Sequence, residues 1–228
     1  MASCDLNKLL DQDFLNSSLF QEAVTHRSVG SRNNERLEYL GDSVLDLIIA
    51  QYLFVKFPDL KEGDLSRTRS HLVKKDTLAE IGSEIDLGRL IALGQGELKS
   101  GGQKRSTIIA DALEAIIGAL YLHKGLSETQ DFIFKLFKSR LNKLPSPEQL
   151  KDPKSQLQEL LQAKNMPLAR YSLINTQGAS HAQSFNSLCT IKVLSIITSA
   201  WGSTKRRAEQ ASARKALDII LKFDEGNN

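Results

Sequence analysis

Residues 34–43 read NERLEYLGDS, and their acidic side chains recur at helical spacing. In a helix, Glu35, Glu38 and Asp42 stand at positions i, i+3 and i+7, which places three carboxylates on one face. A second stretch, residues 110–118 (ADALEAIIG), offers Asp111 and Glu114 at i and i+3 in almost wholly apolar surroundings. The two patterns predict two helices whose carboxylates emerge from a packed region.

These carboxylates need a counter-charge. Like charges at this spacing cost a helix roughly 0.2–0.5 kcal/mol per pair, and partial burial costs more when no cation is near. The sequence offers few nearby cations, since no Lys or Arg lies between Ser106 and His123. A divalent cation would remove the repulsion, and an all-oxygen ligand set favours Mg²⁺, with Mn²⁺ as a substitute, over zinc. Ordinary solvated acidic faces are the alternative for either pair taken alone.

Helical periodicity dominates residues 6–141. Apolar residues such as Leu37, Leu40, Val44 and Ile48 recur at three- and four-residue steps. We expect helices near 6–14, 17–25, 33–56, 64–81, 84–91, 103–123 and 126–141, with glycine-rich loops at 94–96 and 101–102. Residues 1–143 are therefore predicted to form an all-α domain.

The chain changes character at residues 144–151, the predicted linker, where LPSPE at 144–148 places two prolines one residue apart. Beyond the linker, Asp152 suits a helix N-cap and Pro153 the first helical position. Strand-like runs and a last helix follow, at 169–174, 184–193, 196–201 and 204–222. Residues 152–228 are thus predicted to be a small α+β domain of α-β-β-β-α order.

The balance of charged residues also changes near the predicted linker. Residues 1–150 carry 19 Lys and Arg against 21 Asp and Glu, whereas residues 151–228 carry 11 against 6. An acidic part joined to a small basic part suggests separate duties for the two parts. A chance split explains the same numbers when they are taken alone.

Several classes of protein are disfavoured by the sequence. No apolar run approaches the ~18–20 residues that span a bilayer, and residues 1–14 lack the features of a secretory signal. Cys4 and Cys189 cannot build a disulfide framework and do not suggest a zinc site. Cys189 alternates with Phe185, Ile191 and Val193, which predicts a buried thiol on a strand. We expect a cytoplasmic protein with no membrane partner and no organic cofactor.

Five blocks of this sequence resemble ribonuclease III in order and spacing. They are THRS at 25–28, NERLEYLGDSVL at 34–45, EGDLSR at 62–67, GQGELKSGG at 94–102 and DALEAIIG at 111–118. The tail, with Gly178, His181 and KRRAEQA at 205–211, resembles the double-stranded-RNA-binding domain that follows the nuclease domain in bacterial members. The resemblance covers nearly the whole chain, and the block at 34–45 is highly specific.

The resemblance implies roles for the acidic residues. It assigns metal ligation to Glu38, Asp42, Asp111 and Glu114, and it credits Asp42 and Glu114 with catalysis as well. Glu35 and Glu62 match acidic positions that line the cleft near the subunit boundary and influence cleavage or substrate positioning. Every acidic position of the family pattern is filled.

The resemblance also implies an activity. It is hydrolysis of double-stranded RNA to 5′-phosphate and 3′-hydroxyl ends, by a homodimer with one site per subunit. Ribosomal RNA precursors and structured messages are the expected substrates. Metal ions held by carboxylates supply the nucleophilic water and relieve charge on the phosphate. His26 is expected to brace the fold, and the segment 46–55 to serve either the dimer interface or the core.

The tail is predicted to bind duplex RNA, which is recognised by shape, phosphates and 2′-hydroxyls. The last helix begins at Ser203 and Thr204 and places Lys205, Arg206 and Arg207 in its first turn, where cations oppose the helix dipole at ~0.3–1 kcal/mol each. Such a turn forms a phosphate trap; a solvated basic turn is the alternative. The resemblance adds three minor-groove contacts: Gln158, Gln162 and His181.

Two other functions remain open at this point. A non-cleaving protein that protects or remodels duplex RNA would use the same dimer and the same tail. A metal-dependent hydrolase of small nucleotides would use the carboxylates but would leave the basic tail unexplained.

Overall fold

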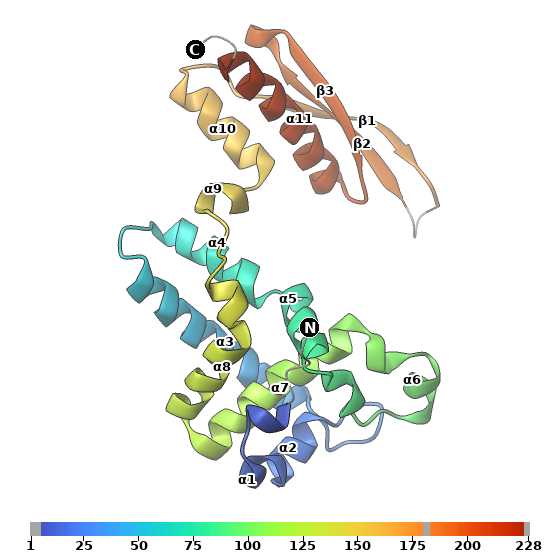
Figure 1. Ribbon diagram of the computed structural model, residues 1–228. Coiled ribbons are helices and arrows are strands. Elements are labelled where there is room, and N and C mark those ends of the chain that lie inside the picture. The colour runs from blue at the N-terminus through green and yellow to red at the C-terminus, as the bar shows by residue number, and fades with distance from the viewer. Residues whose placement is uncertain (1–5, 180–182, 226–228) are drawn as a thin grey trace. The chain divides into compact units, whose positions relative to one another are not determined.

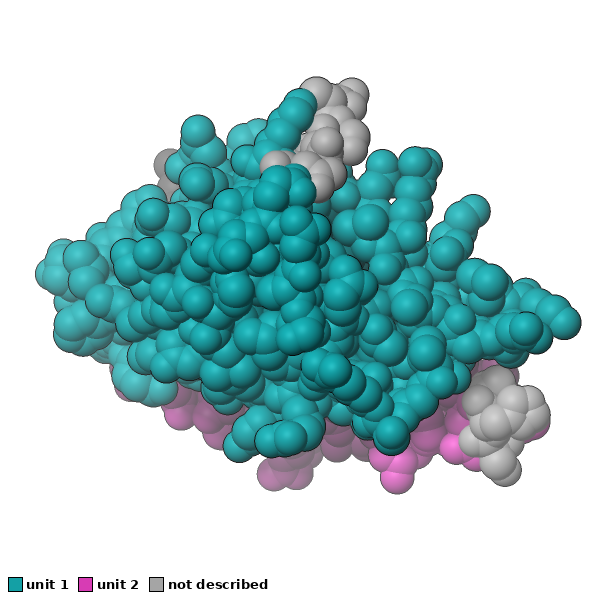
Figure 2. All heavy atoms as spheres, turned by 90° about the horizontal axis from the view of Figure 1, so that it is seen from below, with its two compact units in different colours: residues 1–147 teal, residues 148–228 magenta. Residues whose placement is uncertain are grey.

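The computed structural model describes residues 6–179 and 183–225. They divide into two compact units, Met1–Pro147 (unit 1) and Glu148–Asn228 (unit 2), which are coloured separately in Figure 2. The predicted linker, 144–151, contains a short helix, α9 (Pro147–Leu150).

The regular secondary structure in the described residues of unit 1 is helical, apart from one isolated bridge between Thr25 and Ala92 (Figure 1). Its α-helices are α1 (Gln12–Leu15), α2 (Ser18–Ala23), α3 (Glu35–Lys56), α4 (Glu62–Val73), α5 (Lys75–Glu84), α6 (Gln95–Lys99), α7 (Ser106–Lys124) and α8 (Leu126–Leu141). Three short 3₁₀ turns, η1 (Leu6–Lys8), η2 (Leu87–Arg89) and η3 (Gly102–Lys104), complete it. The predicted all-α class is confirmed.

The pairing of α3 with α7 organises this unit. On α7 every residue from Ala112 to Leu120 is buried, and on α3 Leu45, Ile48 and Ile49 are almost fully so. The two helices meet at glycines: a Cβ atom on Gly41 would lie 1.7 Å from the backbone oxygen of Glu114. A Cβ on Gly118 would lie 2.3 Å from the backbone oxygen of Leu37. The backbones can approach this closely only because neither glycine carries a side chain.

We expect Gly118→Ala to destabilise unit 1, because the added methyl group forces α3 and α7 apart at the centre of the core. The free energy of unfolding should fall by on the order of 2–3 kcal/mol, measured by urea denaturation. Gly96→Ala is the matched control, since a Cβ there meets nothing within 4 Å. Equal stability of the Gly118→Ala variant and the wild type would contradict this account of the helix crossing.

α7 is also the one helix among the described residues that is long and apolar enough to cross a membrane, with a mean hydropathy of 1.3. About two thirds of its apolar stretch (67%) is buried inside unit 1. Its composition therefore matches its position as the central helix of the core.

Several expected helix boundaries were wrong. The helix expected at 6–14 is interrupted: η1 ends at Lys8, and Asp11 caps α1 by accepting a hydrogen bond from the amide of Phe14. The helix expected at 64–81 is two helices, because Lys74 adopts an extended conformation with ψ 149°. No α-helix forms at 84–91, where Asp86 is left-handed (φ 55°) and only η2 follows. The loop expected at 94–96 overlaps the start of α6, which begins at Gln95.

Unit 2 has the predicted α-β-β-β-α order: α10 (Pro153–Ala163), β1 (Arg170–Gln177), β2 (Ser184–Ile191), β3 (Ile196–Gly202) and α11 (Lys205–Glu225), with a 3₁₀ turn, η4 (Lys192–Leu194), before β3. The strands form an antiparallel sheet of order β1-β2-β3. α10 and α11 lie on the same face of that sheet (Figure 1). The α+β class of the tail is confirmed.

Buried and more exposed residues alternate along β2 and β3, so one face of the sheet packs in the core of unit 2. Cys189 and Ile191 of β2 and Ile196 of β3 are buried, and they pack with Leu157 of α10 and Leu217 of α11. The predicted buried thiol at Cys189 is thus confirmed. Cys4 lies outside the described residues.

Candidate active site

The acidic site is formed by α3 and α7. Oxygens of Glu38, Asp111 and Glu114 all lie within 4.8 Å of one another. The close approach of the two helices at Gly41 explains this geometry, since Gly41 packs on the backbone of Glu114 itself. Carboxylates 73 to 76 residues apart in the sequence are thereby brought to one point.

These carboxylates line a cleft of about 710 Å³. Asp42, which is exposed, and Glu35, in the first turn of α3, line the same cleft. Glu62 does not: it begins α4 and lines a separate apolar groove. Of the six acidic residues singled out in the sequence, the structure therefore brings five to one cleft.

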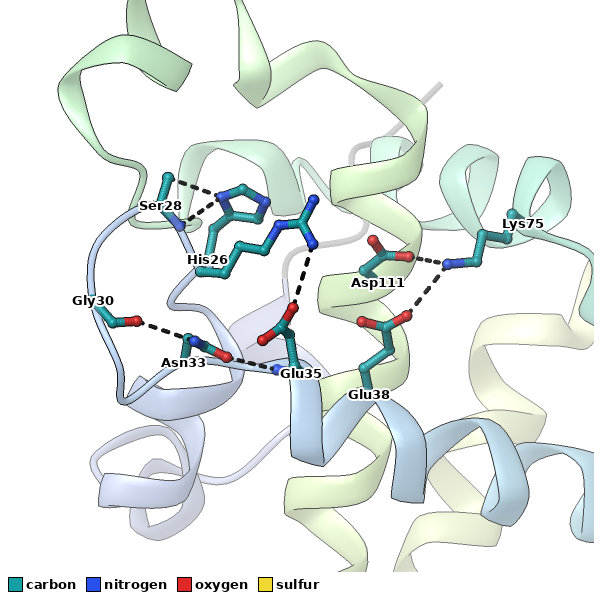
Figure 3. A network of polar contacts seen from close by, with 9 residues as sticks. His26, Ser28, Gly30, Asn33, Glu35, Glu38, Lys75 and Asp111 are labelled. Atoms are coloured by element: carbon teal, nitrogen blue, oxygen red, sulfur yellow. Dashed lines mark hydrogen bonds and ion pairs between the residues drawn. The ribbon is translucent and has the colours of Figure 1, made fainter.

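Lys75 supplies a counter-charge that sequence reasoning missed. Its Nζ lies 3.3 Å from Oε1 of Glu38 and makes a second, shorter contact with Oδ1 of Asp111. Figure 3 shows this side chain reaching from α5 towards the carboxylates of α3 and α7. Lys75 is distant in sequence from all these carboxylates and comes from a third helix, α5, which starts after the break at Lys74.

Burial makes Glu114 the most perturbed acid of the cleft. Only 4% of it is exposed, and this burial raises the pKa of Glu114 to about 7. Lys75 opposes the rise, and the charges of Asp42, Glu38 and Asp111 add to it. Burial, followed by the charge of Asp111, also raises the pKa of Glu38. For Lys75, burial alone would lower the pKa of the ammonium group, but the hydrogen bond to Asp111 and the charges of Asp111, Glu38 and Glu114 together raise it.

One rim of the cleft is braced by the loop that holds His26. Ser28 donates its backbone N–H to Nδ1 of His26 (3.2 Å), and its Oγ accepts the backbone N–H of Gly94 at 2.8 Å. Arg27 forms an ion pair with Glu35 at 3.4 Å. These contacts tie the 25–28 loop to the segment before α6, and the bracing role expected for His26 fits them.

The donor set of the cleft fits a divalent cation of the Mg²⁺ class. Every candidate ligand is a carboxylate oxygen, the donor that hard cations prefer. Lys75 supplies one positive charge among four carboxylates, so the charge of the group is not balanced. Glu38, Asp111 and Glu114 are close enough to share one ion, and Asp42 lies beside them in the cleft.

The raised pKa of Glu114 predicts how stability depends on pH in metal-free buffer. Folded Glu114 keeps its proton up to pH about 7, whereas an unfolded glutamate releases it near the model value of 4.5. Because the folded state binds more protons between these values, unfolding free energy should fall as pH rises from 4.5 to 7, by on the order of 2 kcal/mol. Thermal unfolding in EDTA would measure this slope.

Glu114→Gln should reduce that slope by the contribution of Glu114, because the amide does not titrate. Glu128→Gln is the control: Glu128 is an exposed residue in the first turn of α8 and should leave the slope unchanged. An identical slope in wild type and Glu114→Gln would refute the assignment to Glu114.

The residues predicted to contact RNA lie on two helices of unit 2. Gln158 and Gln162 are exposed on α10, and Ser203, Lys205 and Arg206 are exposed at the start of α11. Thr204 caps α11, since its Oγ1 accepts the backbone N–H of Arg207 at 3.1 Å. His181 lies outside the described residues.

Comparisons with known proteins match both units. The family described as Ribonuclease-III-like matches residues 16–141, and the double-stranded RNA binding motif matches residues 153–220. Ribonuclease 3 of Hahella chejuensis is 51% identical over 93% of this chain and 94% of its own length. Ribonuclease 3 of Dechloromonas aromatica is 47% identical over 97% of this chain and 100% of its own length.

A solved nuclease domain of the Campylobacter jejuni ribonuclease III is similar in structure. It is 40% identical, has a TM-score of 0.57, and the match covers 61% of this chain and 96% of that domain. A second crystal structure of that nuclease domain, described for flexibility in the region involved in dimer formation, matches with a TM-score of 0.56.

A helical unit with a carboxylate-lined cleft, followed by an RNA-binding α-β-β-β-α unit, defines a nuclease directed at double-stranded RNA. The family match and the level of identity make the assignment specific. The chain belongs to the ribonuclease III family. It is an endoribonuclease specific for double-stranded RNA.

Proposed function

We propose that the chain cuts duplex RNA at the α3–α7 cleft with a divalent cation, Mg²⁺ or in its place Mn²⁺, leaving 5′-phosphate and 3′-hydroxyl ends. Ribosomal RNA precursors and structured messages in the cytoplasm are the proposed substrates. The observation that carries the proposal is the convergence of Glu38, Asp111 and Glu114 within 4.8 Å, from two helices.

In this proposal Glu38, Asp42, Asp111 and Glu114 hold the metal. A bound ion would lower the pKa of a water molecule and stabilise the charge that develops on the phosphate. Lys75 keeps the carboxylates of Glu38 and Asp111 oriented towards each other. Burial makes Glu114 the residue of the cleft that exchanges a proton near neutral pH, which suits a catalytic group.

Glu35 and Glu62 are proposed to act from two different places. Glu35 lines the cleft itself, paired with Arg27, and can influence how substrate is seated there. Glu62 borders a groove of about 600 Å³ between α3 and α4. Its influence on cleavage would therefore be exerted from that groove.

We further propose a homodimer that uses this groove. The segment 46–55 is divided between core and surface: Ile48, Ile49 and Leu53 are buried, whereas Leu47, Phe54 and Val55 are 56–73% exposed. Leu47 and Phe54 line the groove. Exposed apolar surface beside a groove is typical of protein interfaces. A two-fold dimer would present two clefts to the two antiparallel strands of a duplex.

For unit 2, we propose that α10 and the start of α11 contact the RNA. Gln158 and Gln162 on α10, and His181 in the β1–β2 loop, are assigned to minor-groove contacts. Ser203, Lys205 and Arg206 are assigned to phosphates, which the exposed basic turn can reach. A solvated basic turn remains the alternative for these residues.

Cleavage is the first test. Wild-type protein should cut a labelled RNA duplex in Mg²⁺, and Glu114→Ala should lower the cleavage rate by at least roughly a hundredfold while leaving duplex affinity within twofold. Gel analysis of products and filter binding in EDTA measure the two quantities. Glu128→Ala, which removes an exposed carboxylate from α8, is the control and should cut normally.

The outcomes separate the alternatives. Duplex binding without any cutting by the wild type would favour a non-cleaving RNA-binding protein. Indifference to duplex RNA would favour a hydrolase of small nucleotides.

The basic turn is tested by salt dependence. Replacing both Lys205 and Arg206 by alanine should weaken duplex binding and lower the slope of log affinity against log salt by roughly one to two. Replacing Lys192 and Lys222, two exposed cations elsewhere in unit 2, removes the same charge as a control. An unchanged slope in the first variant, or an equal change in both, would count against the assignment.

A further inference from the structure

Lys154 joins three elements of unit 2. It lies in the first turn of α10, and its Nζ is 2.7 Å from Oε2 of Glu209 on α11. The same ammonium group lies over the ring of Tyr171 on β1, 4.3 Å from the ring centroid. A second contact between the helices, from Arg214 to Gln156, does not include the sheet. The Lys154–Glu209 pair is therefore a polar contact that links α10 to α11 and, through the ring of Tyr171, to β1.

The pair lies one helical turn from a proposed RNA contact on each of the two helices. Lys154 precedes Gln158 by four residues on α10, and Glu209 follows Lys205 by four residues on α11. Residues four apart lie on the same side of a helix. The ion pair thus links the two helices one turn from Gln158 on α10 and one turn from Lys205 on α11.

Glu209 is an unfavourable residue for an RNA-binding surface when charge alone is considered. It places a carboxylate one turn from Lys205, Arg206 and Arg207, where it repels phosphates and reduces the local positive potential. Its side chain is only 32% exposed and that of Lys154 only 35%, so both are held in place rather than freely solvated. A structural advantage must offset the electrostatic cost.

We propose that Lys154 and Glu209 form a positioning pair, seated on Tyr171, that sets the spacing between the minor-groove residues of α10 and the basic turn of α11. Correct spacing lets both helices contact one duplex at the same time. This inference rests on the proposed RNA contacts of unit 2. Neither residue of the pair needs to touch RNA.

Glu209→Gln tests the pair, because charge and positioning predict opposite results. Removing a carboxylate beside a phosphate trap should tighten binding if only charge matters. If the pair positions the helices, binding to a 30-base-pair RNA duplex should weaken by roughly three- to tenfold. The full chain is used in EDTA, so that affinity is measured without cleavage.

Glu159→Gln is the matched control. Glu159 lies on α10 and pairs with Lys151 at 2.7 Å, so the variant removes the same charge without touching α11. It should bind as tightly as the wild type or slightly more tightly. Glu209→Asp adds a second variant that keeps the charge and shortens the reach; the proposal expects weaker binding, and charge alone expects no change.

Rescue completes the test. Exchanging the two residues, Lys154→Glu with Glu209→Lys, restores an ion pair between the helices and should recover at least part of the lost affinity. Circular dichroism should show a folded unit 2 in every variant compared.

Binding by Glu209→Gln and Glu209→Asp that equals or exceeds that of the wild type would overturn the positioning role, while the proposed function would stand. A wild-type chain that fails to bind the duplex would overturn both.

Discussion

The contact on which the structure depends is the approach of two helix backbones, α3 and α7, at Gly41 and Gly118. It carries the centre of the core of unit 1 and places the carboxylates at the same time. Gly41 packs on the carbonyl of Glu114, so the residue that closes the helix pair also fixes the position of the buried acid. The contact that packs the two helices together therefore also positions the acidic site.

That arrangement concentrates negative charge where solvent is scarce. The protein responds in two ways: burial and the neighbouring carboxylates raise the pKa of Glu114, and Lys75 bonds to Glu38 and Asp111. Unit 2 instead concentrates positive charge, and does so at its surface. Three exposed cations, Lys205, Arg206 and Arg207, stand in the first turn of α11, and the carboxylate of Glu209 one turn further on is held by Lys154.

The sequence predicted the acidic cleft because two i, i+3 carboxylate pairs stand in apolar surroundings, a pattern that only helices convert into a shared face. It did not predict Lys75, whose place depends on the extended conformation of Lys74. No proline or glycine marks the break at Lys74, so hydrophobic periodicity predicted one continuous helix across it. Similarly, hydrophobic spacing predicted a helix over 84–91, which the left-handed conformation of Asp86 interrupts. Glu62 was expected at the cleft, but the position of α4 places it in the apolar groove.

Lys75 belongs to α5, and this has a consequence for how the polypeptide assembles. A chain in which α3 and α7 have paired while α5 is still undocked holds its acids together with no cation among them. Docking of α5 relieves that repulsion as it buries Leu78 and Ile81. A partly assembled chain of this kind lacks both the buried surface of α5 and the charge of Lys75, and docking of α5 supplies the two together.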